Sequence, residues 1–145
     1  MSANWHVTWH QDVVINVKEK KETDGFTGWT RKGGALGVIP PDDCLKKTIT
    51  VRIHLDDTNE NNGALKVIPG SHNKRLSDEE ISVITQNSVP HVCAVEACGV
   101  QVMKPLLLHA SSKVTSQKSR RVIHLEFNPE PLPGKLEWAE WHEIH

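Results

Sequence analysis

The chain has 145 residues, with 17 basic and 18 acidic side chains and a formal net charge of −1. This length suits one domain, and the balanced charge creates no long-range field that attracts nucleic acid or an anionic membrane. No stretch reaches the roughly 18 apolar residues of a membrane span, and the start lacks the order of a signal peptide. Three cysteines, an odd set, fit a reducing compartment. We therefore expect a cytoplasmic protein, with residues 1–145 forming a single domain.

Short apolar runs separated by turn residues dominate the chain. The first predicted strand carries His10 and continues to Val17, and a polar loop is predicted from Lys18 to Gly37. A strand is predicted over 48–55 and another over 64–68, with a tight reversal between them at Asn61-Asn62-Gly63.

The second half of the chain begins with the best helix candidate, Leu76 to Gln86, which has acidic residues in its first turn. Four short runs bounded by Gly, Pro or Ser then predict strands over 92–95, 99–103, 106–110 and 122–127. In the tail, Trp138 and Trp141 are three residues apart and would share one face of a short helix. Many strands and few helices predict a mainly all-β sandwich or barrel with one or two short helices.

Three of the predicted strands alternate polar and apolar side chains, and their polar faces carry histidine and arginine. An ordinary half-exposed sheet accounts for each strand taken alone. Histidine and arginine, however, bind metals and anions, whereas a wet face is usually built from Lys, Glu, Ser and Thr. The polar positions are His10 and Asp12; Arg52, His54 and Asp56; and Arg120, His124 and Glu126.

A metal site is predicted from His10, Asp12 and His109. Side chains at i and i+2 of a strand share a face, about 7 Å apart at their bases, so His10 and Asp12 can reach one ion. His109 ends a very apolar run, where an unbonded histidine is costly to bury. Taken alone, His109 is more readily a hydrogen-bonded core histidine; with the first pair and with Arg120 eleven residues later, it completes the facial triad that holds Fe(II).

Five blocks of sequence, in order, resemble the phytanoyl-CoA dioxygenase family of Fe(II)- and 2-oxoglutarate-dependent oxygenases. The resemblance covers most of residues 4–127. It implies a double-stranded β-helix (a jelly-roll or cupin-like fold) as the core, with 128–145 as a C-terminal tail. The blocks are Asn4-Trp5 leading into 9–12, then 52–57, 62–72, 105–112 and 119–127.

The resemblance also implies an activity: a dioxygenase that uses Fe(II), 2-oxoglutarate and O2 to hydroxylate a small organic substrate, releasing succinate and CO2. His10, Asp12 and His109 match the iron ligands, and no further catalytic residue is predicted. Arg120 matches the residue that pairs with the distal carboxylate of 2-oxoglutarate, for which a planar guanidinium is suited. Arg120 also shares the polar face of its strand, which favours it over Arg121.

Three more positions are predicted to contact the co-substrate. Ser111 and Gln11 match family positions that lie close to 2-oxoglutarate. Arg52 departs from the family, where the position is often tryptophan, so a second contact to an oxoacid carboxylate is a hypothesis. A cupin-like metal isomerase could use the same ligands, but Arg120 argues against it.

The short segment before the first ligand leaves an alternative open. Only nine residues precede His10, whereas family members usually carry helices there that cover the main sheet. We expect the apolar faces at 13–17, 51–55 and 123–127 to lack this cover, so that the tail, a homodimer or a partner protein shields them. The alternative function is an N-terminally truncated, catalytically impaired relative that binds metal or a partner protein.

Overall fold

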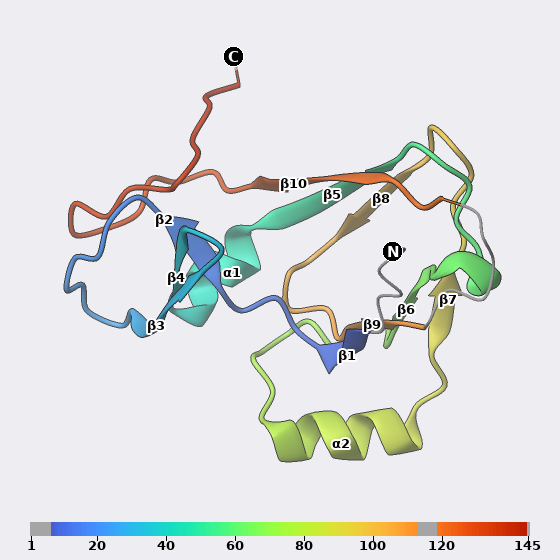
Figure 1. Cartoon of the computed structure of the whole chain (residues 1–145). Coiled ribbons are helices and arrows are strands. Elements are labelled where there is room, and N and C mark those ends of the chain that lie inside the picture. Colours follow the sequence, from blue (N-terminus) through green and yellow to red (C-terminus); the bar gives the residue numbers. More distant parts are fainter. Residues whose placement is uncertain (1–6, 113–118, 145) are drawn as a thin grey trace.

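The computed structural model describes residues 7–112 and 119–144, which form mostly β-strands in three antiparallel sheets (Figure 1). The described part of the chain has ten strands, two α-helices and one short 3-10 helix. The prediction of a mainly β protein with few helices is confirmed. None of the helices in these ranges is long and apolar enough to cross a bilayer.

The four-stranded sheet carries the predicted histidine ligands. Its order is β1 (Val7–His10), β9 (His109–Ser111), β6 (Leu65–Val67) and β7 (His91–Cys93). The register pairs His10 with His109 across β1 and β9, which brings together residues 99 positions apart in sequence. Helix α2 (Asp78–Asn87) lies beside β1 on the outer side of this sheet (Figure 1).

A three-stranded sheet faces the ligand-bearing sheet, in the order β10 (Val122–Phe127), β5 (Ile49–His54) and β8 (Val100–Met103). On its inner face Met103 packs against Leu65 and Val67 of the other sheet, which joins the two layers. Residues paired across antiparallel strands share a face, so Arg52 lies between His124 and Gln101 on the same inner side.

The third sheet is formed by β2 (Ile15–Val17), β4 (Ala35–Ile39) and β3 (Thr27–Lys32). It is covered by the short helix α1 (Asp42–Lys47) and by the C-terminal tail, which bonds to β2 through Lys18 N to Glu137 O at 3.0 Å and Ala139 N to Asn16 O at 3.0 Å. The main hydrophobic core lies here. Its buried members are Ile15, Val17, Phe26, Val38, Leu45, Leu106, Leu132 and Leu136.

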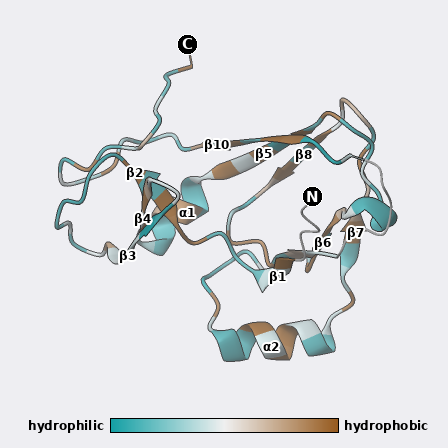
Figure 2. Cartoon of the chain, in the orientation of Figure 1, coloured by the Kyte–Doolittle hydropathy of each residue, from teal (hydrophilic) through white to brown (hydrophobic). Residues whose placement is uncertain are grey.

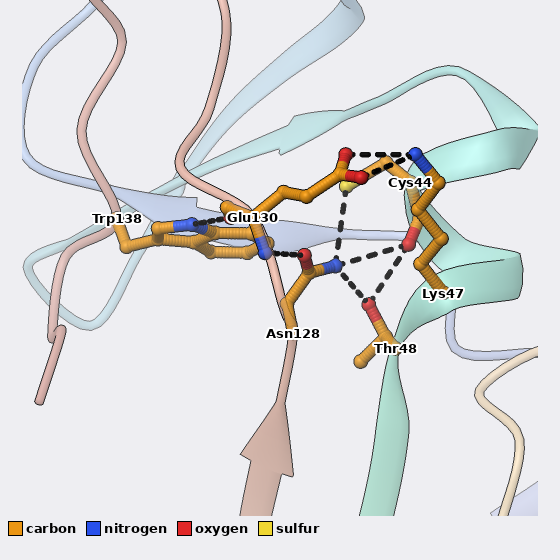
Figure 3. A network of polar contacts seen from close by, with 6 residues as sticks. All are labelled: Cys44, Lys47, Thr48, Asn128, Glu130 and Trp138. Carbon is orange, nitrogen blue, oxygen red and sulfur yellow. Dashed lines mark hydrogen bonds and ion pairs between the residues drawn. The ribbon is translucent and has the colours of Figure 1, made fainter. Parts of the chain in front are cut away.

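Asn128 fastens the tail to α1 and β5 (Figure 3). Its Nδ2 donates to Cys44 O at 3.1 Å and to Thr48 Oγ1 at 2.8 Å, and its Oδ1 accepts from Glu130 N at 3.0 Å. Glu130 in turn pairs with Lys47 at 2.7 Å, and its carbonyl accepts from the Trp138 indole at 3.2 Å. These contacts direct the tail from the end of β10 toward the third sheet.

Local turn and cap signals were read correctly from the sequence. Helix α2 begins after Ser77, whose side chain caps Glu80 N while the Glu80 carboxylate accepts from Ser77 N, a capping box. The reversal at 61–63 is the 3-10 helix η1 (Glu60–Asn62), capped by Asn59 and ended by Gly63 at φ +87°, a conformation that glycine adopts without strain.

Several predicted boundaries were wrong. The polar loop from Lys18 to Gly37 contains β3 and most of β4, joined at Gly33-Gly34. The strand through 10–17 is interrupted, since residues 11–14 are irregular and β1 and β2 belong to different sheets. The strand predicted from residue 106 begins only at His109, because Leu107 N donates to Lys104 O at 3.0 Å in a turn.

The tail also differs from the predicted short helix, because residues 128–144 contain none. Trp138 and Trp141 still stack, with ring centroids 6.2 Å apart. Trp138 packs on the core beneath the third sheet, where Ile15 and Val17 are buried, so the tail shields the apolar face at 13–17, as one of the expected alternatives had it.

Candidate metal centre

Three predicted ligands converge at the edge of the four-stranded sheet. His10 ends β1, His109 begins β9 and Asp12 follows β1 by two residues. One donor atom from each of the three lies within 4.8 Å of the others. The two imidazole rings are 4.2 Å apart between centroids.

Backbone carbonyls fix the orientation of both histidine rings. His10 Nδ1 lies 2.8 Å from Thr8 O, and His109 Nδ1 lies 2.7 Å from Leu107 O. A carbonyl only accepts, so each Nδ1 carries a proton, and in the neutral form of each ring Nε2 then keeps its lone pair. The Nε2 atoms lie 3.5 Å and 3.6 Å from the two carboxylate oxygens of Asp12.

Asp12 reaches the histidines by a route that strand alternation did not predict. Its backbone lies outside β1, and its N–H donates to Pro105 O at 2.9 Å. This bond ties the Asp12 backbone to the segment that leads into β9, so the carboxylate and His109 are positioned by the same turn. The residues were predicted correctly although the continuous strand was wrong.

The ionisable groups at the centre differ in how they favour a metal. Burial raises the pKa of Asp12, but the hydrogen bond with His10 and the nearby charge of His109 more than offset this, so the pKa is lowered. Burial lowers the pKa of His109, which favours its neutral form. Asp12 and His109 are thus held in the states that bind a metal, an ionised carboxylate and a neutral imidazole. The Asp12 hydrogen bond raises the pKa of His10, so a proton competes with a metal ion there.

The donor set fits one divalent ion of the first transition row. Donors at about 2.1 Å from a shared ion can lie up to about 4 Å apart, and the two histidine-to-aspartate separations fall below that limit. Two imidazoles and one carboxylate on one side of an ion leave its other positions open. The outer hydrogen bonds from each Nδ1 to a carbonyl are those that usually orient metal-binding histidines.

Three arginines, one within β5 and two just before β10, are placed differently. Arg121 is exposed and forms an ion pair with Asp56 at 2.7 Å, whereas Arg120 is half-buried and its Nη1 donates to Gly63 O. Arg52 lies on the inner face of β5, and its buried Nε has no hydrogen-bond partner among the described residues. Burial lowers the pKa of Arg52, and the charge of Arg120 lowers it further.

Ser111 and Gln11 have distinct surroundings. Ser111 follows His109 by two residues on β9, and its buried Oγ has no partner in the described ranges. The Gln11 side chain is occupied by backbone groups: Nε2 donates to Leu106 O at 2.5 Å and Lys74 O at 3.0 Å, and Oε1 accepts from Leu76 N at 2.8 Å. Contact of Gln11 with a co-substrate stays a prediction, because the structure assigns its amide to joining three segments.

The space between the two facing sheets holds buried polar atoms that lack hydrogen-bond partners among the described residues: Thr50 Oγ1, Arg52 Nε and Ser111 Oγ. His54 and Gln101 face the same space, and burial lowers the pKa of His54, which the interaction between their side chains raises. Arg52 and Ser111 were predicted from the sequence, whereas Thr50 and Gln101 were missed, although every second residue of β5 is polar. Buried polar groups are normally satisfied, so the partnerless atoms indicate a place for a polar ligand.

An open pocket of about 340 Å³ adjoins the metal centre and is lined from both sheets. Its lining residues are His10, Gln11, Asp12, Val13, Val14, His124 and Glu126. A larger pocket of about 510 Å³ lies at the tail around Trp138 and Trp141, and none of the predicted ligands lines it. The chemistry therefore belongs to the smaller pocket, where metal ligands and solvent meet.

Facing antiparallel sheets with a His-Asp-His cluster at one edge define a cupin-like fold of the kind found in non-haem iron oxygenases. The sequence matches the family described as "Phytanoyl-CoA dioxygenase (PhyH)" over residues 1–122. The chain belongs to the phytanoyl-CoA dioxygenase family, as its sequence blocks predicted. This membership supports an enzyme of the Fe(II)/2-oxoglutarate type.

Solved structures share the fold at low identity. "Crystal Structure of EvdMO1" has a TM-score of 0.59 at 21% identity, covering 88% of this chain and 24% of that one. AviO1 from Streptomyces viridochromogenes Tue57 has a TM-score of 0.58 at 23% identity, covering 89% and 46%. A non-heme monooxygenase, the ThoJ-Ni complex, has a TM-score of 0.52 at 16% identity, covering 94% and 41%.

A curated relative, "Uncharacterized protein Rv1501" of Mycobacterium tuberculosis, is 31% identical over 80 residues, which is 55% of this chain and 28% of that protein. "Uncharacterized protein Mb1539" of Mycobacterium bovis matches with the same values. The chain thus spans less than half the length of the solved structures, and its match covers under a third of the curated relatives.

Proposed function

We propose that this protein is a non-haem Fe(II)- and 2-oxoglutarate-dependent dioxygenase that hydroxylates a small organic substrate. The observation that carries the proposal is the convergence of His10, Asp12 and His109, with both histidine tautomers set for metal binding. Membership of the phytanoyl-CoA dioxygenase family supports the same chemistry.

In this proposal His10, Asp12 and His109 hold Fe(II), and the open pocket beside them admits the substrate. With 2-oxoglutarate and O2, the bound metal supplies the oxidising chemistry that inserts oxygen into a C–H bond and releases succinate and CO2. The protein's own part is to keep Asp12 ionised, to keep the lone pair of each imidazole directed at the ion, and to orient both substrates.

The proposed co-substrate site lies between the two sheets, where Arg52 and Arg120 approach each other. Neither guanidinium has a carboxylate within 4.0 Å among the described side chains. Two half-buried cations repel each other and are costly to desolvate, and the charge of Asp12 offsets this only in part, because the pKa of Arg52 is still lowered. A dicarboxylate neutralises both, and the partnerless Ser111 Oγ can donate a further hydrogen bond to it.

A catalytically impaired relative that binds metal or a partner protein is the second candidate function. One observation favours it: among the described residues, the outer face of the β10-β5-β8 sheet is apolar and exposed, as a surface that binds a partner protein would be. The ligands themselves favour the enzyme, because the exacting side chains at the centre are all present. The two candidates differ in turnover rather than in metal binding.

Anaerobic titration separates these candidates. Purified protein with Fe(II) and 2-oxoglutarate is expected to develop a visible metal-to-ligand charge-transfer band, and to release succinate when air is admitted. A band without succinate supports the impaired relative, and absence of the band overturns the co-substrate assignment. His109→Ala is expected to abolish the band, while His72→Ala, at an exposed turn, serves as the matched control.

A further inference from the structure

The outer face of the β10-β5-β8 sheet is apolar at every position. Register pairing forms rows across the three strands, and each row on the outer side contains only aliphatic or aromatic residues. The alternate rows, on the inner side, carry the polar groups that face the metal centre. The outer rows are Ile123, Ile53 and Val100; Leu125, Val51 and Val102; and Phe127 with Ile49.

This outer face, with Leu55 just beyond β5, is open to solvent. Apolar residues, coloured brown, recur along the ribbons of β10, β5 and β8 (Figure 2). The most exposed of these residues, seven in number, show between 38% and 64% of their surface: Ile49, Leu55, Val100, Val102, Ile123, Leu125 and Phe127. At roughly 150–250 Å² for a fully exposed residue of this size, they present on the order of 600 Å² together. The largest apolar patch on a typical monomer is about 300–600 Å², and larger ones mark interaction sites.

Nothing in the described part of the chain covers this face. Helix α2 lies beyond the other sheet, next to β1 (Figure 1). The tail, which could have folded back over β10, is held at Asn128 and bonded to β2, so it covers the third sheet instead. Of the three shields expected for 51–55 and 123–127, the tail is therefore not the one that covers this face, which leaves a homodimer or a partner protein.

The sizes of the side chains favour a second copy of the same surface. Strand β10 presents Ile123, Leu125 and Phe127, whereas β8 presents only Val100 and Val102. When two such sheets stack about a two-fold axis parallel to β5, β10 of each chain lies over β8 of the other. Large side chains then meet small ones, which is how packed layers interdigitate. An axis across the strands would instead stack β10 on β10.

The area of the outer face is also sufficient for a specific homodimer interface. Two copies of this face bury about 1,200 Å² when stacked, at the lower end of the range for specific protein interfaces. No charged side chain belongs to the rows, and Arg121, opposite Leu55 at their edge, is paired with Asp56. The rows therefore present no charge that would repel a second copy. A closed two-fold pair also leaves no exposed copy of the face that could extend into a fibre.

We propose that this protein forms a two-fold homodimer through the outer face of β10-β5-β8, with β10 of each protomer packed over β8 of its partner. The metal centres lie on the inner side of the sheets, so both pockets stay open to solvent in the dimer. This inference does not depend on catalytic activity.

The first test is the mass of the full chain in solution. A protomer has a mass of 16.3 kDa, so light scattering or sedimentation equilibrium is expected to report about twice that value at tens of micromolar. A monomer or a polydisperse aggregate at 100 µM (roughly the limit for a weak specific pair) overturns the proposal. A monomer would instead favour cover by another polypeptide.

The second test addresses the arrangement. Val102→Glu and Leu125→Lys are each expected to weaken dimerisation about 100-fold or more, because each places an unpaired charge in the interface. Val89→Glu is the matched control, since Val89 is 91% exposed and lies outside the face. Ni²⁺ binding at the metal centre, measured in parallel, shows that each variant remains folded.

Mixing the two variants distinguishes the two possible axes. If β10 lies over β8, the introduced glutamate and lysine face each other once in the mixed pair, and a 1:1 heterodimer is expected to form. The pair Val102→Lys with Leu125→Glu is expected to behave in the same way. Failure of both mixtures to assemble, with a dimeric wild type, overturns the β10-over-β8 arrangement.

Discussion

Arg52→Gln provides the sharpest test of the proposed co-substrate site, because it is expected to change stability and affinity in opposite directions. In the protein without co-substrate, the Arg52 guanidinium is largely removed from water, its Nε has no partner, and it lies near the charge of Arg120. Glutamine keeps much of the length and removes the charge. The variant is therefore expected to unfold less readily than the wild type.

The magnitudes follow from ordinary hydrogen-bond energies. A buried polar group without a partner costs about 1–3 kcal/mol, so the free energy of unfolding is expected to rise by about 1 kcal/mol in Arg52→Gln. Hydrogen bonds to charged groups contribute about 1.5–3 kcal/mol, so the dissociation constant of 2-oxoglutarate is expected to increase roughly 10- to 150-fold. Binding of 2-oxobutyrate, which lacks the distal carboxylate, should change far less.

The assay combines urea denaturation of the metal-free protein with anaerobic titration of the Fe(II) complex, followed by its charge-transfer band. Arg121→Gln is the control, since Arg121 is exposed and paired with Asp56 outside the site. A loss of stability with unchanged 2-oxoglutarate affinity would show that Arg52 has a structural role and would refute the reasoning. Absence of the band in the wild type would instead reject the enzyme assignment itself.

Three further predictions concern the centre and its supports. Ni²⁺ or Co²⁺ is expected to raise the melting temperature of the wild type but not that of Asp12→Asn. Because the pKa of His10 is raised above 6.5, protons stabilise the metal-free protein below that pH and compete with the metal. The metal affinity measured by calorimetry should therefore increase as the pH rises through the His10 pKa. Gln11→Leu is expected to lower the free energy of unfolding, measured in urea, by about 2–4 kcal/mol, because the buried backbone groups that Gln11 contacts lose their partners. A decrease of less than about 1 kcal/mol, which is usual for a surface substitution, would contradict this role. The hydrogen bond with Arg121 lowers the pKa of Asp56 to about 2, so the Asp56 carboxylate stabilises the fold above pH 3.8 and this stabilisation is lost as the pH falls toward 2. In an acid titration followed by circular dichroism, Asp56→Asn should not show this loss of stability.

The sheet that faces the metal centre could be predicted from sequence because its alternation is strict. The strand at 122–127 has the predicted bounds, and 49–54 differs from the prediction by one residue at each end. In both strands every second residue is apolar, which is the signal that a two-residue period requires. Alternation does not say which face is buried, and here the polar face is the inner one.

The third sheet could not be predicted because its edge strand lacks that signal. In β3 only Trp29 is partly buried, and the other positions are exposed, so no apolar period marks the strand. The available hairpin signal was the Gly33-Gly34 turn between β3 and β4, where both glycines have positive φ. The strands are placed by β4, which pairs with both neighbours and whose Val38 is fully buried.

The metal centre shows what short motifs convey and what they leave out. The His-x-Asp spacing identified the ligands, but they converge through a bend at 11–14 and a backbone bond to Pro105 rather than along one strand face. The tautomers depend on carbonyls two residues before each histidine, which no residue pattern specifies. The cluster of partnerless polar atoms likewise emerges only when β5 and β9 are brought together.

The inner and outer faces of β5 are linked by geometry, and this ties the exposed apolar surface to the proposed chemistry. Because side chains alternate along a strand, a slip of one residue would move Arg52 outward and place Ile53 among the polar groups. The inner face consists of polar side chains whose partners are incomplete, so it gives little preference for the native register by itself. The apolar outer rows favour the native register of β5 only if a partner surface buries them. A dimer that buries Val51 and Ile53 would therefore hold Arg52 in position, so Val102→Glu should weaken 2-oxoglutarate binding at a distance while Val89→Glu should not.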